Sequence, residues 1–170
     1  MARASPASSQ RFMEFTHLRY FNIFGLRQDP NGAYAAVVPT LVSSMIHNEP
    51  VYINGDGETS RDFCYIDNVI QANLLAATST HVEAANQVYN VAVGERTSLN
   101  ELFVAIRDNL VPTFPHLENT QPVHRDFRAG DVRHSLADIA KAQTRLGYTP
   151  THRIHKGLAE AMEWYIRDLG

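Results

Sequence analysis

Two arginines near glycine-containing turns are the residues of this 170-residue chain best suited to binding an anion. Arg61 follows the tight turn at 55–57, and Arg128 stands directly before a second turn. A guanidinium group stays charged and donates two parallel hydrogen bonds, so two of them on separate loops suit one diphosphate. The spacing equally allows each arginine to pair with a neighbouring aspartate, Asp62 or Asp131. On spacing alone, both interpretations stay open.

Other reactive residue types lack the partners that their chemistry requires. The nine glycines form no complete dinucleotide-binding turn, and the nearest candidate, at 55–57, lacks the third glycine. His152 and His155 are three residues apart without a second ligand pair, so no metal site is predicted. Cys64 stands beside aromatic residues with no obvious base partner, which predicts a buried structural thiol rather than a nucleophile.

The composition favours one domain in a reducing compartment. Hydrophobic residues make up 44% of the chain, which is enough for one core. The net charge of −3 and the mixed signs of the charged residues give no indication of a nucleic-acid partner. No apolar run approaches the roughly 20 residues of a membrane helix. One cysteine permits no intrachain disulfide, so a cytoplasmic location is expected.

The first residues differ in character from the rest of the chain. Residues 1–10 are small and polar and lack the apolar region of a secretory signal. Segment 1–13 is therefore predicted to be a disordered or non-native lead-in. The folded part is expected to span 14–170.

Strands and helices alternate along this part, which predicts an α/β fold with parallel strand pairing. Asp67 is a candidate helix N-cap, and Ser98 with Glu101 has the pattern of a capping box. The irregular order and the long loops indicate part of a sheet with an appended lobe. Hydrophobic periodicity places strands at 14–21, 51–53, 87–93 and 123–127, and helices at 39–47, 67–77, 136–146 and 154–168, with another after Ser98.

Several segments together resemble the C-terminal half of extended short-chain dehydrogenases/reductases that act on nucleotide sugars, in the NAD-dependent epimerase/dehydratase family. These segments are 19–25, 55–67 and 128–131, and they occur in the family's order from about Phe15 onward. Segments 27–34 and 131–135 resemble the branch of UDP-N-acetylglucosamine 4-epimerases. The resemblance implies the edge of a partial Rossmann-like parallel sheet plus the smaller C-terminal substrate-binding lobe.

The resemblance also implies a role for each matching residue. Two aromatic residues would lie near the nicotinamide of NAD, and a set of polar and apolar residues would hold the UDP-sugar. In this interpretation Tyr20 and Phe21 contact the cofactor. Val38 lines the uracil pocket, and Tyr52 and Asn54 flank the uridine. Asn22 contacts the sugar diphosphate, Arg61 and Arg128 hold the pyrophosphate, and Asp131 accepts from the ribose hydroxyls. The alternative for Tyr20, Phe21 and Tyr52 is that they are ordinary core aromatics.

Ser135 matches the family position that lies against the hexose. A small side chain there leaves room for an acetamido group, whereas a tyrosine would fill that space. UDP-N-acetylhexosamines are therefore the expected partners, with UDP-glucose and UDP-galactose tolerated. The alternative is that Ser135 merely caps a helix before Leu136.

The activity implied is NAD-dependent 4-epimerisation, in which UDP is held tightly and the hexose loosely. This chain contains neither the family's glycine-rich turn nor its Tyr-x-x-x-Lys pair. It is therefore expected to supply the UDP-sugar anchor, to contain no catalytic residue, and to be inactive alone, while NAD is bound mainly by an N-terminal half. Alternatives are a dehydratase or decarboxylase of the same family, or a non-catalytic UDP-sugar-binding fragment. Full-length relatives are expected to be homodimers.

Overall fold

The computed structural model describes residues 15–30 and 36–170. The predicted lead-in at 1–13 lies outside the described residues. So do positions 31–34 of the segment that resembles the 4-epimerase branch.

Two parallel strands and two helices form one end of the molecule, here called the strand lobe. β1 (Thr16–Tyr20) pairs in parallel with β6 (Gln87–Val91). Because parallel neighbours need a long crossover, the chain between them forms α2 (Ile66–Thr78), which packs on both strands. α4 (Ala140–Leu146) packs on β6. Tyr89 of β6 is fully buried in this core.

Three helices form the other end, here called the helical lobe. α1 (Val37–Ile46), α3 (Leu99–Leu110) and α5 (Ile154–Leu169) contact one another pairwise. Apolar residues three and four positions apart give each helix one buried face. The side chains with no exposed surface include Val42, Met45, Leu102, Ile106, Leu158 and Tyr165.

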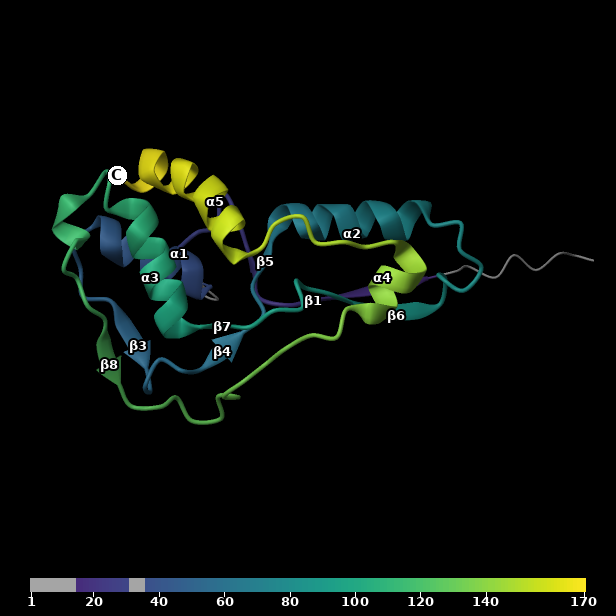
Figure 1. Ribbon diagram of the computed structural model, residues 1–170, viewed down its shortest axis with the longest axis horizontal. Helices are drawn as coiled ribbons and strands as arrows, with labels where there is room; N and C mark the ends of the chain where they lie inside the picture. The colour runs from purple at the N-terminus through teal and green to yellow at the C-terminus, as the bar shows by residue number, and fades with distance from the viewer. Residues whose placement is uncertain (1–14, 31–35) are drawn as a thin grey trace, which may run out of the picture.

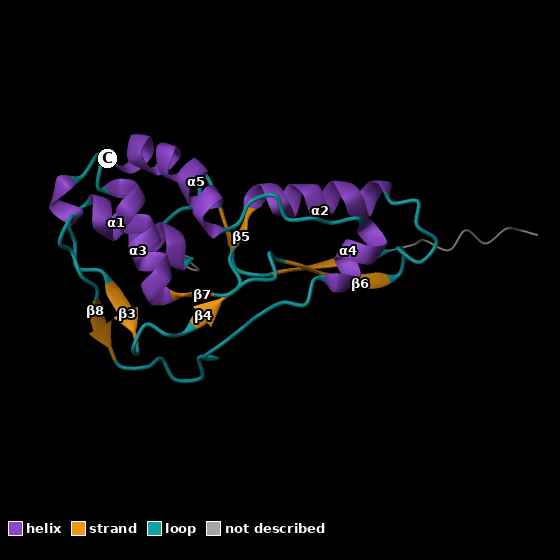
Figure 2. Ribbon diagram, viewed as in Figure 1, coloured by secondary structure: helices purple, strands orange, loops and turns teal. Residues whose placement is uncertain are grey.

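Short strands connect the two lobes and extend the helical one. Figure 1 shows the elongated molecule that results, with the strand lobe at one end and the helical lobe at the other, and Figure 2 shows the strands lying between and below the helices. The pairs are β2 (Ile23–Phe24) with β5 (Cys64–Tyr65) and β3 (Tyr52–Asn54) with β8 (Val123–Arg125), both parallel, and β4 (Ser60–Arg61) with β7 (Thr97–Ser98), antiparallel. A 3-10 helix spans Pro115–Leu117.

The predicted α/β class with parallel pairing is confirmed. The capping box is also confirmed, because the Ser98 side chain accepts from the Glu101 N–H and the Glu101 carboxylate accepts from the Ser98 N–H. Gly147 ends α4 in the left-handed conformation, with φ of 69°.

Two predicted helix starts were wrong. Asp67 lies in the first turn of α2, and Tyr65 occupies the N-cap without a side-chain cap. The helix expected from Leu136 begins only at Ala140. Residues 136–139 are irregular because tertiary partners take their backbone groups. The Ala137 N–H donates to Asp62, and the carbonyl of Asp138 accepts from Asn90.

Among the described residues, no helix is both long and apolar enough to cross a membrane.

Candidate functional site

One cavity of about 280 Å³ brings together most of the predicted substrate-binding residues. Arg61 of β4 and Arg128 of the loop after β8 both line it, although 67 positions separate them in the sequence (128 − 61). Two arginines from separate loops therefore line the same space. The predicted residues on its wall are Asn22, Val38, Asn54, Arg61, Arg128 and Asp131.

One side of this cavity is apolar. Val38, in the first turn of α1, is 1% exposed, and Phe24 and Phe63 are similarly buried. Leu99, the first residue of α3, completes this side. Flat apolar surface next to polar groups suits a ring that is hydrophobic on its faces and polar at its edge.

The sequence spacing left open whether Arg61 forms an ion pair with an aspartate. Its guanidinium donates to the Asp131 carboxylate at 2.6 Å, and the adjacent Asp62 points elsewhere. The alternative that Arg61 pairs with an aspartate is therefore correct in part. Its partner is Asp131 on the loop of Arg128, and not the adjacent Asp62. Arg128 forms no ion pair within 15–30 and 36–170. One of the two cavity arginines therefore keeps an unpaired charge.

Asp62 is a buried acid that supports the site without lining it. It has no exposed surface, and its carboxylate accepts from the N–H groups of Val93 and Gly94, each at 2.9 Å. Burial raises the pKa of Asp62 above its usual range, although these hydrogen bonds act in the opposite direction. Its own carbonyl accepts from the Asn22 side chain at 3.0 Å. Asp62 thus fixes the strand ends from which the cavity walls extend.

A second cavity of about 380 Å³ adjoins the first. It shares Asn22, Arg61 and Asp131 with its neighbour, so the arginine–aspartate pair stands at the border. The rest of its wall is formed by Tyr20, Phe21, Gly130, Val132 and Ser135. The predicted cofactor contacts and the predicted hexose contact therefore lie on one cavity.

The structure contradicts two alternative interpretations, that Tyr20 is a core aromatic and that Ser135 caps a helix. Tyr20 is 46% exposed and donates its hydroxyl to Asn73, so it is not a core aromatic. Ser135 caps no helix, because α4 begins five residues later, at Ala140.

Tyr52 is not among the residues that line either cavity. Its ring is 45% exposed and lies 3.2 Å below the guanidinium carbon of Arg125. Asn54, two residues along the same strand, does reach the first cavity. The contact of Tyr52 with uridine stays a prediction.

The loop that carries Arg128 and Asp131 is tied to β4 by the backbone. Ser60 donates its N–H to the Arg133 carbonyl at 2.8 Å, and Ser135 donates to the Ser60 carbonyl at 3.1 Å. The Ser60 hydroxyl and His134 Nδ1 lie 2.9 Å apart. These contacts bring the two arginine loops together.

A second tie connects the glycine turn to the same loop. Arg133 pairs with Asp56 at 2.6 Å and holds the pKa of that carboxyl below its usual range. Gly55 has a φ of 73°, and a Cβ there would collide with the Phe127 ring. Only glycine therefore lets the two loops approach so closely.

Reasoning from the sequence missed several of these residues. Thr59 and Leu99 line the first cavity, Val132 lines the second, and Arg133 and His134 hold the loop. The capping box at Ser98 was the available signal for Leu99, because it located the start of α3. The others lie within segments 55–67 and 131–135, which carry the resemblance, but no role was predicted for them.

Comparison with known proteins identifies the family of this chain. Residues 2–92 match the model of the "NAD dependent epimerase/dehydratase family". This match begins ahead of position 14, where the folded part was expected to start, and that boundary stays a prediction. A UDP-glucose 4-epimerase of Mycolicibacterium smegmatis is 29% identical over 153 residues, which are 90% of this chain and 46% of that protein.

Two solved structures show the same fold. The UDP-glucose 4-epimerase of Thermotoga maritima with UDP-glucose has a TM-score of 0.82 and 37% identity, covering 93% of this chain and 48% of that one. The UDP-N-acetylglucosamine 4-epimerase of Methanobrevibacter ruminantium, in complex with UDP-N-acetylmuramic acid, has a TM-score of 0.79 and 38% identity, covering 91% and 47%.

The chain spans about half the length of the relatives it matches. Others among them are named as a dTDP-glucose 4,6-dehydratase and a UDP-N-acetyl-glucosaminuronate decarboxylase. The family model covers more than half of the chain, and the fold agrees with it. This chain belongs to the NAD dependent epimerase/dehydratase family.

Proposed function

We propose that this chain is the UDP-sugar anchor of an NAD-dependent 4-epimerase that acts on UDP-N-acetylhexosamines. The observation that carries the proposal is the pair of adjoining cavities with Arg61 and Asp131 at their border. Uridine would occupy the first cavity, against Val38 and Leu99. The hexose would occupy the second, against Ser135.

The diphosphate would exchange partners with the ion pair at the border. A phosphate oxygen accepts from Arg61 in place of Asp131, which is then able to accept from the ribose hydroxyls. Arg128 supplies the second guanidinium. Because binding energy is spent on the non-reacting nucleotide, the hexose stays free to turn between its two faces.

NAD, when bound, would supply reversible hydride transfer at C4 of the hexose. Tyr20 and Phe21 line the second cavity, which supports a contact between their rings and a nicotinamide ring. The chain has no Tyr-x-x-x-Lys pair and no glycine-rich turn, so proton transfer and most cofactor binding would fall to residues outside it. We expect the 170-residue chain to bind substrate and not to turn it over.

Titration of the purified chain by calorimetry tests the anchor. UDP, UDP-glucose and UDP-N-acetylglucosamine should each bind at one site. In Ser135→Tyr, affinity for UDP-N-acetylglucosamine should fall about tenfold or more, because the ring fills the space of the acetamido group, while UDP binds as before. Ser135→Ala is the matched control. Absence of UDP binding by the folded chain would overturn the anchor itself.

Dehydration or decarboxylation of a nucleotide sugar is the alternative that the relatives' names keep open. Tighter binding of a dTDP-sugar than of any UDP-sugar would contradict the UDP-sugar anchor. It would not decide between a dehydratase and an epimerase, because a dTDP-L-rhamnose 4-epimerase is also among the relatives. A cytoplasmic location agrees with the single, buried cysteine.

A further inference from the structure

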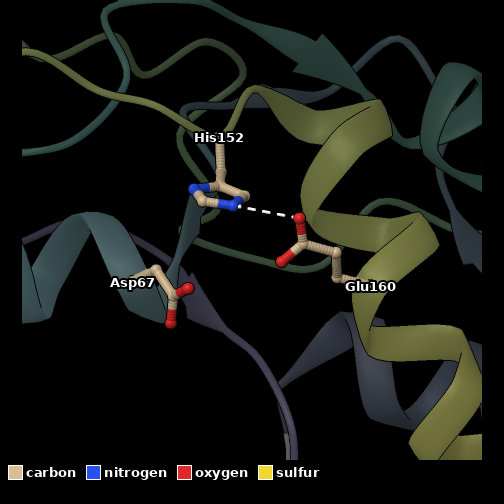
Figure 3. A group of neighbouring side chains, drawn as sticks. All are labelled: Asp67, His152 and Glu160. Atoms are coloured by element: carbon tan, nitrogen blue, oxygen red, sulfur yellow. Dashed lines mark hydrogen bonds and ion pairs between the residues drawn. The ribbon is translucent and has the colours of Figure 1, made fainter.

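Three side chains outside the cavities gather at the junction of the two lobes (Figure 3). Asp67 extends from the first turn of α2, His152 precedes α5, and Glu160 extends from α5 itself. His152 Nε2 lies 3.1 Å from a Glu160 carboxylate oxygen. One ligand atom from each of the three residues lies within 4.8 Å of the other two. None of them lines the nucleotide or hexose cavity.

The backbone at His152 is held by a buried amide. Asn68 has no exposed surface, and its Oδ1 accepts from the N–H groups of Thr151 and His152 at 2.8 and 3.1 Å. Its Nδ2 donates to the His152 carbonyl at 2.7 Å. Because Asn68 directly follows Asp67 on α2, the acid and the imidazole are fixed relative to each other.

The imidazole ring is oriented as well as anchored. His152 Nδ1 lies 2.8 Å from the Thr151 hydroxyl, and the ring is 5.1 Å from that of Tyr65. The side chain is 11% exposed. Metal-bound histidines commonly use their second ring nitrogen in such a hydrogen bond, which leaves the other nitrogen for the ion. Here the other nitrogen is Nε2, which faces the carboxylates and contacts Glu160 at 3.1 Å.

The cluster carries an excess of negative charge. Asp67 and Glu160 contribute two carboxylates beside one imidazole. Lys156 lies 4.0 Å from Glu160 but is exposed, so its flexible side chain is able to turn into solvent. Two carboxylates and one oriented imidazole are a donor set of mixed oxygen and nitrogen, which suits Zn²⁺ better than Mg²⁺.

We propose that Asp67, His152 and Glu160 form a binding site for a divalent transition-metal ion of the Zn²⁺ class. Three protein ligands leave at least one position for water. The ion would replace the hydrogen bond between His152 and Glu160 and draw Asp67 into the same shell. It would then connect α2 of the strand lobe to α5 of the helical lobe.

Metal titration of the purified 170-residue chain tests the proposal. Calorimetry should show one Zn²⁺ per chain, and the Tm should rise by about 5 °C at a hundredfold excess over Kd, with reversal by EDTA and no comparable rise in Mg²⁺. Asp67→Asn, His152→Gln and Glu160→Gln should each weaken binding about tenfold or more. Glu163→Gln and His155→Gln, two exposed positions on α5, are the matched controls.

Glu160→Gln is the decisive variant because Glu160 is on the surface and its loss should leave the metal-free fold intact, which circular dichroism checks. Loss of Zn²⁺ binding in this variant and in His152→Gln, with binding kept in both controls, supports the site. No binding by the unaltered chain, or binding that survives both ligand substitutions, overturns it. UDP affinity measured on the same proteins should be unchanged, which separates this site from the proposed nucleotide site.

Discussion

Arg61 differs from Arg128 in its ion pairing. In the described structure its charge is neutralised by Asp131, while Arg128 on the same cavity has no such partner. Because Arg61 must give up an existing partner, the two arginines should contribute unequally to ligand affinity.

Removing either cavity arginine should weaken UDP binding. Arg128→Ala removes charge-assisted hydrogen bonds outright, so Kd should rise about 10- to 100-fold. Arg61→Ala should cost less, because the bound state replaces an ion pair that already exists. Calorimetry with UDP measures both. Arg107→Ala, whose partner Asp108 lies on α3, is the control. A larger loss at Arg61 than at Arg128 would contradict the exchange of partners.

Cys64 should resist thiol reagents in the folded chain. It is fully buried, as the sequence predicted, and burial raises its pKa to about 11. At pH 8 very little of it is thiolate, and the thiolate is the nucleophile. Labelling with a disulfide reagent should therefore be slow in buffer and rapid in guanidinium chloride. Rapid labelling of the native chain at pH 8 would contradict this account.

At the scale of elements, buried polar residues hold the site more than the strands do. The strands near the cavity are only two or three residues long. Asp62 joins the end of β6 to the segment before α4, and Ser60 with His134 joins β4 to the arginine loop. These contacts compensate for the small number of backbone ladder bonds.

Asp62→Ala should be strongly destabilising. It leaves the N–H groups of Val93 and Gly94 buried without an acceptor, at about 1–3 kcal/mol for each group. The free energy of unfolding should fall by about 2–4 kcal/mol in urea titrations. Asp56→Ala, an exposed acid on the adjacent turn, should cost much less. Equal effects of the two substitutions would contradict this role for Asp62.

The same residue predicts a pH dependence. The pKa of Asp62 is raised in the folded chain, so the folded state holds this proton to higher pH than the unfolded state does. This contribution to stability is complete below about pH 4, the pKa of an unfolded aspartate, and is lost as pH rises through the folded pKa. Asp62→Asn should flatten the decline in stability above pH 4. An unchanged pH profile in this variant would contradict the raised pKa.

At the scale of the molecule, the chain forms two hydrophobic cores, and the strand lobe exposes a strand edge and apolar side chains. Among the described strands, β1 pairs with β6 alone, so its second edge is free. Ile70 and Leu74 on α2 are 51% and 62% exposed. Free edges and apolar faces favour association.

The purified chain should therefore self-associate as its concentration rises. Ile70→Lys with Leu74→Lys should shift the sedimentation profile toward monomer, because two charges then lie on the apolar face. Val104→Lys, on the exposed side of α3, is the matched control. A chain that stays monomeric at high concentration would contradict the prediction.

Local patterns determined most of the elements. The spacing of Leu102 and Ile106, the capping box at Ser98 and the glycine at 147 are short-range signals, so the cores of α3, α4 and α5 could be predicted. The start of α4 could not, because Asp62 and Asn90, far away in the sequence, take the backbone groups that a longer helix would use.

The residue types and their order determined the family resemblance. That resemblance named half of the residues that line the two cavities. Only the tertiary structure decided the pairings. Arg61 reaches Asp131 rather than Asp62, and His152 meets Asp67 and Glu160 rather than His155. The physical reason is that an ion pair or a ligand set depends on distances in space, and two segments remote in sequence are brought within hydrogen-bond range only by the packing of both lobes.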